Sequence, residues 1–106
     1  MGHSIQEKFL IMSNTLKLVL KDIWFEKIKA GVKTHEYREY KDYWIKRLSV
    51  ANKYSYVEFQ KAYRKNPEKM IFEIKSIKIL KPNSKNDLNT NQTVFDIELG
   101  KRIDLY

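Results

Sequence analysis

The apolar residues between positions 70 and 80 change phase partway along the segment, and this change restricts the folds open to the chain. They occupy even positions in the first half and odd positions in the second: Met70, Phe72, Ile74, Ile77 and Ile79. Because side chains alternate between the two faces of a strand, one extra residue near 75–76 restores a continuous apolar face. The pattern therefore predicts a long strand with a β-bulge or sharp bend, and such bends let a short sheet curl into a barrel.

Five further segments have the alternation of strands, and two have helical spacing. The expected strands cover residues 16–20, 33–38, 54–59, 94–99 and, after a turn at Gly100, a short last strand with Ile103 and Leu105. The first helix is expected to begin with Asp22 as its N-cap and to end before Gly31, a residue free to take positive φ. The elements together predict an α+β fold, a small bent mixed β-barrel of about five to six strands with two short helices.

The second expected helix covers residues 40–48 and carries a stripe of large side chains at helical spacing: Tyr40, Tyr43, Trp44 and Leu48. We interpret the stripe as core packing against the barrel, with stacking of Trp44 on a nucleobase as the alternative. Residues 81–92 are rich in Asn, Ser and Lys, which predicts a mobile loop that could act as a lid.

Length and composition indicate one globular domain. The chain has 106 residues, of which 42% are hydrophobic, and this is enough for a modest core. We expect residues 1–11 to be a flexible N-terminal extension or a cloning remnant, and residues 12–106 to be the domain. No apolar run is long enough to span a bilayer, so no membrane association is expected. The sequence has no Cys and two His, which argues against disulfides, cysteine nucleophiles and a metal site, and favours a cytoplasmic location without a cofactor.

The chain is strongly basic, with 21 Lys and Arg against 13 Asp and Glu and a formal charge of +8. Such an excess suits a polyanionic partner, because Lys and Arg attract phosphates. A lysine-rich genome explains the same excess equally well. One basic segment includes Tyr63 and Arg64, between Lys61 and Lys65, and predicts a patch for phosphate contact and base stacking, or else a solvated loop.

Residues 33–38 concentrate charge on a predicted strand. By alternation Thr34, Glu36 and Arg38 share one face, while Lys33, His35 and Tyr37 lie on the other. Glu36 and Arg38 could form an ordinary ion pair on a solvated face, or could line a cleft. In a cleft, Lys33 could bind a phosphate or lose its proton and act as a base, and Glu36 could accept hydrogen bonds from a nucleobase.

The spacing Gly31-x-Lys33-x-x-Glu36-x-Arg38, directly after a helix with Trp24 and Phe25, resembles the signature of ASCH domains of the PUA-like superfamily, in its small phage or bacterial type. Residues 43–48 and 95–100 agree with the family in order and character. The resemblance implies a strongly bent β-barrel with two helices and a cleft lined by the signature. Many members are thought to bind RNA or nucleotides, and some are hydrolases.

One branch of the family hydrolyses N4-acetylcytidine with a threonine nucleophile at the position that Glu36 holds here, and with a lysine that matches Lys33. This chain keeps the lysine but has a carboxylate in place of the hydroxyl, and Thr34 lies two residues earlier. The resemblance therefore leaves Glu36 as a group that could activate water, with Lys33 as its acid/base partner.

Three functions remain open on this basis. The first is binding of RNA, or of a nucleotide or nucleoside, and the second is hydrolysis of a modified nucleoside or RNA by Lys33 and Glu36. The third is interaction with another protein. The oligomeric state is not constrained. The residues expected to bind a ligand are Lys33, Thr34, Glu36, Arg38, Trp24, Tyr63 and Arg64.

Overall fold

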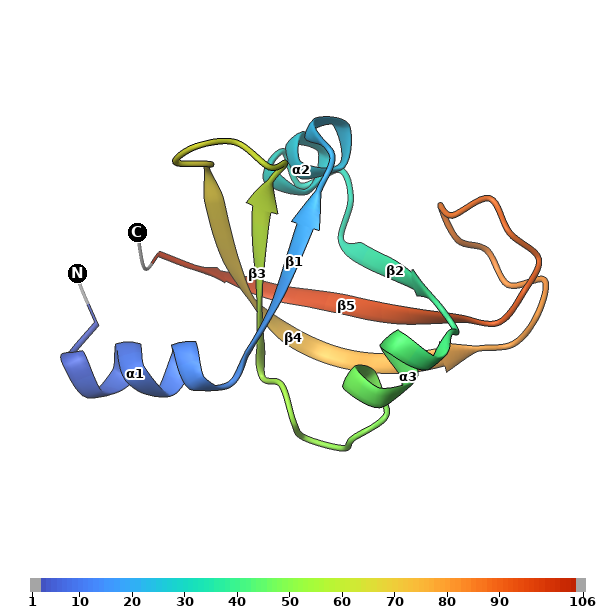
Figure 1. Cartoon of the computed structure of the whole chain (residues 1–106), viewed down its shortest axis with the longest axis horizontal. Coiled ribbons are helices and arrows are strands. Elements are labelled where there is room, and N and C mark those ends of the chain that lie inside the picture. The colour runs from blue at the N-terminus through green and yellow to red at the C-terminus, as the bar shows by residue number, and fades with distance from the viewer. Residues whose placement is uncertain (1–2, 105–106) are drawn as a thin grey trace.

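The computed structural model describes residues 3–104, which form one five-stranded mixed sheet curled into a half-barrel, together with three helices (Figure 1). This confirms the predicted α+β class. The elements in chain order are α1 (Ile5–Ser13), β1 (Thr15–Leu20), α2 (Asp22–Lys29), β2 (His35–Glu39), α3 (Asp42–Leu48), β3 (Tyr56–Lys61), β4 (Lys69–Leu80) and β5 (Val94–Ile103).

The strand order leaves the half-barrel open between β1 and β2. The sheet runs β1-β3-β4-β5-β2, so the two strands that come first in the sequence lie at its opposite ends. β1 pairs with β3 in parallel, and the remaining three pairs are antiparallel. Helix α2 connects β1 to β2 and lies over the end of the sheet where these strands converge (Figure 1).

The predicted bend of the longest strand is present. The pairing of β4 with β5 shifts register between Phe72 and Ile74 and again between Ile74 and Ser76. Gly100 was expected to form a turn, and this was wrong: it lies within β5 opposite the irregular part of β4. A Cβ at Gly100 would lie 3.3 Å from the Cβ of Glu73, so the glycine permits close approach of the two strands at the bend.

The concave side of the sheet and the inner face of α2 form the core. Leu16, Leu18 and Leu20 of β1 are buried, as the alternation predicts. They pack in one cluster with Phe25 and Ile28 of α2 and with apolar residues from every other strand except β2, namely Val57, Phe59, Met70, Phe95, Ile97 and Leu99. The short strand β2 instead contributes charged side chains to this face.

The two ends of α2 differ in how well the sequence predicts them. Gly31 has φ +77°, as expected for a glycine that follows a helix. Asp22 is not the N-cap: Lys21 holds that position without a side-chain hydrogen bond, and Asp22 is the first helical residue. The Asp22 carboxylate still lies in the first turn, where the helix dipole favours negative charge.

A third helix lies at the N-terminus, in the segment that the sequence argument set aside. The hydroxyl of Ser4 accepts a hydrogen bond from the Glu7 amide at 3.1 Å and caps α1. Ile11 is the buried residue of this helix, which crosses the expected domain boundary at residue 12. The expected last strand is the continuation of β5 to Ile103, and Leu105 lies outside the described residues.

Candidate functional site

A cavity of about 250 Å³ lies where β1 and β2 fail to pair. Residues from both strands, from α2 and α3 and from the loop that follows β4 line it: Val19, Leu20, Lys21, Trp24, Glu36, Tyr37, Arg38, Glu39, Trp44, Asp87 and Leu88. The cavity therefore draws on segments that are far apart in the sequence, and the opening of the half-barrel creates it.

Glu36 is the central charged group of the cavity wall. It lies opposite Ile97 of β5 in the register, so its side chain is on the concave face and is buried. Its Oε2 accepts a hydrogen bond from Nη2 of Arg38 at 2.7 Å, and its Oε1 lies 3.3 Å from Nζ of Lys33. A buried carboxylate needs such partners, since an unpaired charge there would be strongly destabilising.

Lys33 lies just before β2 begins, so strand alternation does not govern its direction. The sequence placed it on the face opposite Glu36, but its side chain instead turns toward that carboxylate. It also forms an ion pair with Asp87, and its Nζ lies 5.2 Å from the ring centres of both Trp24 and Tyr37. The Lys33 ammonium is thus surrounded by two carboxylates and two aromatic rings, and its side chain is only 8% exposed.

Asp87 is an acidic residue of the site that the sequence did not predict. It lies in the loop between β4 and β5, and 54 positions separate it from Lys33. The side chain of Asn86 orders this loop, because its amide nitrogen donates to the carbonyls of Ser84 and Thr90. Only the ion pair with Lys33 reveals the role of Asp87, and no local sequence pattern indicates it.

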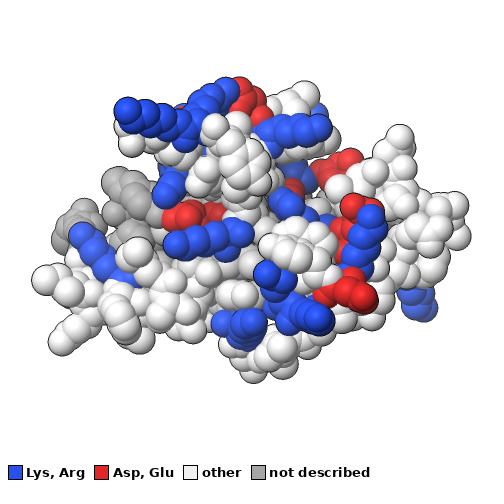
Figure 2. Space-filling model, in the orientation of Figure 1, with Lys and Arg blue, Asp and Glu red and all other residues white. Residues whose placement is uncertain are grey.

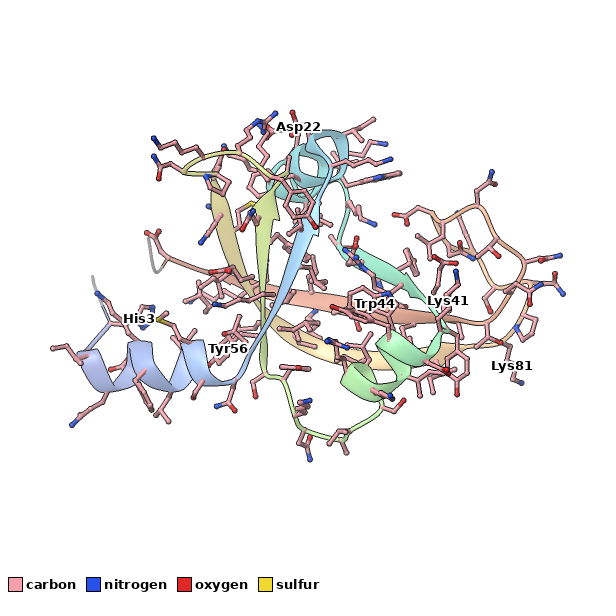
Figure 3. All side chains as sticks on the ribbon, viewed as in Figure 1. His3, Asp22, Lys41, Trp44, Tyr56 and Lys81 are labelled. Atoms are coloured by element: carbon pink, nitrogen blue, oxygen red, sulfur yellow. The ribbon has the colours of Figure 1, made fainter. Side chains whose placement is uncertain are left out.

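Two tryptophans approach the cavity from different helices. Trp24 belongs to α2, and Trp44 belongs to α3 (Figure 3). The guanidinium carbon of Arg38 lies 5.0 Å from the Trp44 ring centre, while Nε of Arg38 is buried without a hydrogen-bond partner among the described residues. The predicted second helix is present as α3, but it begins at Asp42 and leaves Tyr40 outside it. The predicted stripe is only partly core, because Tyr40 is 42% exposed and Tyr43 is 57% exposed.

Thr34 is separated from Glu36 and Arg38, contrary to the face that alternation predicted. It is exposed, precedes the first residue of β2, and lines a neighbouring pocket together with Lys33 and His35. Trp24, Tyr37 and Asp87 line both this pocket and the cavity. The carbonyl of Thr34 accepts a hydrogen bond from the Leu99 amide at 3.0 Å. Thr34 thus contributes its backbone to the contact between the start of β2 and β5.

The outer face of β2 carries a second small polar group. Nδ1 of His35 lies 2.7 Å from Oδ1 of Asp96, and the His35 ring stacks on Tyr37 with 6.2 Å between ring centres. Burial raises the pKa of the Tyr37 phenol, and the carboxylates of Asp96 and Asp87 raise it further. Tyr37 therefore remains neutral at physiological pH and offers a hydroxyl and a ring, not a charge.

The predicted patch at Tyr63 and Arg64 does not reach the cavity. Tyr63 is 90% exposed, and Arg64 forms an ion pair with Asp22. Two further pairs join the same elements, Lys61 with Glu26 at 2.7 Å and Lys29 with Glu68 at 2.6 Å. Figure 2 shows basic and acidic side chains together over α2, so much of the positive charge expected for phosphate is used to attach the helix to the β3–β4 connection.

Within residues 3–104, no group of three or more His, Asp or Glu side chains is arranged to hold a metal ion, and no helix is long and apolar enough to cross a bilayer. Comparison of the chain with protein-family models, with curated proteins and with solved structures found no match.

The ion pairs that attach α2 predict a dependence of stability on pH. A hydrogen bond from Arg64 lowers the pKa of Asp22 in the folded protein, so this pairing stabilises the fold above about pH 4 and is lost as the pH falls through the lowered pKa. We expect Asp22→Asn to lower the unfolding midpoint slightly at about pH 7 and to have less effect at about pH 2, as measured by thermal unfolding. Arg64→Gln should reproduce the neutral-pH loss, and an equal effect of Asp22→Asn at both pH values would contradict this assignment.

Proposed function

We propose that the chain binds a nucleobase in the cavity between β1 and β2, as part of a nucleoside, a nucleotide or single-stranded RNA. The observation that carries this proposal is the buried carboxylate of Glu36 on the cavity wall, held in one orientation by Arg38 and Lys33. An oriented carboxylate is a suitable acceptor for the N–H groups on the edge of a base.

The size and the aromatic walls of the cavity support the same ligand class. Its volume of about 250 Å³ is below the range of about 300–1,000 Å³ typical of pockets for drug-sized molecules, which favours one base or nucleoside over a longer segment. Trp24 and Trp44 on its wall provide flat surfaces of the kind on which bases stack. The positive charge of Arg38, beside Trp44, adds to this recognition.

The charges around Glu36 favour recognition of the base over capture of a phosphate. Lys33 and Arg38 pair with the carboxylates of Glu36 and Asp87, so this network of two cations and two carboxylates is formally neutral. A phosphate that approached Lys33 would meet both carboxylates. The excess of basic residues elsewhere on the chain would then act on phosphates outside the cavity.

The first test compares Glu36→Gln with the unaltered protein. We expect the substitution to weaken binding of the preferred ribonucleoside by about tenfold or more, because a hydrogen bond to a charged acceptor contributes about 1.5–3 kcal/mol. The chain has two tryptophans and both line the cavity, so binding of each ribonucleoside is followed by quenching of tryptophan fluorescence, and Trp44, which lines the cavity and not the neighbouring pocket, separates the two sites when Trp24 is replaced by Phe. Glu73→Gln makes the same chemical change on the exposed surface of β4 and should leave binding unchanged.

Thermal unfolding of Glu36→Gln shows whether the fold survives, and Lys33→Ala and Arg38→Ala provide independent changes in the same network. Binding of no ribonucleoside and no single-stranded RNA by the unaltered protein, even at low salt, would overturn the proposal.

A second test concerns Asp87. We expect Asp87→Asn to increase the affinity for a nucleoside 5′-monophosphate relative to its nucleoside by about tenfold, because one of the two carboxylates that repel a phosphate near Lys33 is removed. The measurement is the ratio of the two dissociation constants in each protein. An unchanged ratio would show that Asp87 does not exclude phosphate from the cavity.

Hydrolysis of a modified nucleoside or of RNA is the second candidate function, favoured by the distance of 3.3 Å between Nζ of Lys33 and Oε1 of Glu36, the carboxylate on the cavity wall. Thr34 lines the neighbouring pocket together with Lys33, and neither residue lines this cavity, so a threonine nucleophile at position 34 would act outside the cavity that Glu36 lines. The remaining possibility is activation of water by Glu36. We then expect Glu36→Gln to abolish release of acetate from N4-acetylcytidine or cleavage of RNA, and full turnover by this variant would contradict the role of Glu36.

A further inference from the structure

The second half of β4 has a free backbone edge. β3 pairs with β4 only over Lys69–Glu73, and the amide of Ile74 then donates to the carbonyl of Ser55 at 2.9 Å. Beyond this point β4 continues to Leu80 with β5 on one side. On the other side, the part of the chain that the structure describes provides no backbone partner for residues 75–80.

A groove runs along this free edge. Its volume is about 610 Å³, and the connection between α3 and β3 forms its other wall. The residues of this β4-edge groove are Leu48, Ser49, Val50, Ala51, Asn52, Lys53, Tyr54, Ser55, Ile74, Lys75, Ser76, Ile77, Ile79 and Phe95. None of them lines the cavity between β1 and β2, so the two sites are separate.

The groove combines an apolar surface with charge of one sign. Ile79 and Val50 are 54% and 55% exposed, and the partly buried Ile77 lies beside them on the groove wall. Its charged lining residues are Lys53 and Lys75, with no carboxylate among the lining residues. A ligand that complements this groove has unpaired backbone groups, apolar side chains and negative charge.

We propose that the β4-edge groove binds an extended, acidic segment of a different protein, which adds to the sheet as a strand beside residues 75–80. Backbone hydrogen bonds to the free edge would provide affinity, and alternate side chains of the segment would contact the apolar residues. Lys53 and Lys75 select for carboxylates on the incoming strand. A second copy of this chain is a poor occupant, because it would bring the Lys75 and Lys78 side chains of two edges together on chains that each have a formal charge of +8.

The competing interpretation is protection of an edge strand. Lysines and bulges are common devices that prevent a free edge from pairing with other chains, and β4 has both. Protection predicts that no extended peptide binds here, whatever its charge. The two interpretations therefore give opposite results in one experiment.

The probe is a synthetic peptide of alternating Val and Glu, and the control peptide has Lys in place of Glu. We expect the acidic peptide to slow amide hydrogen exchange of residues 75–80 in the full chain, as followed residue by residue by NMR, and the basic peptide to have no effect. The double variant Lys53→Glu and Lys75→Glu changes side chains on exposed positions, so the fold should survive, and it should reverse the preference between the peptides.

Three results would overturn the proposal. The first is no protection of residues 75–80 by the acidic peptide, and the second is protection confined to the other sheet ends, β1 or β2. The third is a dimer of the unaltered chain in sedimentation with these amides protected, which would assign the edge to a second copy. Loss of ribonucleoside binding in the tests of the cavity would leave this proposal unaffected, because the groove shares no residue with it.

Discussion

The failure of β1 and β2 to pair is the constraint on which the rest of this structure depends. A closed barrel would fill the space between them with backbone hydrogen bonds and apolar side chains. Here α2 spans the gap instead, and β2 directs Glu36 and Arg38 into the space that closure would occupy. The cavity and its charged wall thus both result from the opening between β1 and β2, which we call the seam.

The buried network at this seam carries a physical cost that hydrophobic packing would avoid. Lys33 and Glu36 are each 8% exposed at the side chain, and moving such charges out of water is unfavourable unless each finds a partner. The two carboxylates and two cations satisfy one another, and the aromatic rings of Trp24 and Tyr37 lie beside the Lys33 ammonium. Apolar residues of similar volume would serve stability at least as well, so the charges at this position favour a role in recognition.

The sequence predicted the parts of the fold that local patterns encode. The phase change in residues 70–80 located the bend of β4, and alternation identified the buried face of β1. It also placed Glu36 and Arg38 on the same face of one strand, which the structure shows to be the concave face. It misplaced Lys33, whose direction is set by ion pairs and not by a strand. The sequence did not predict Asp87 as a site residue, because its ion pair with Lys33 joins segments that are far apart in the chain. It also did not predict the ion pair of Arg64, because the partner, Asp22, lies on another element. The pattern within one segment predicts which face of a strand or helix is buried. Ion pairs between distant segments are visible only in the three-dimensional structure.

The parallel pairing of β1 with β3 has a consequence for the order in which the molecule assembles. β1 leaves the ribosome early but finds its only strand partner after α2, β2 and α3 have been made, and β2 in turn waits for β5. β4 and β5 are consecutive in the chain, so they can pair as soon as both have been made. Contacts of short sequence separation form fastest. Both strands that border the opening thus need partners that are made later in the chain, and a ligand that binds between them only in the folded protein would stabilise the folded state.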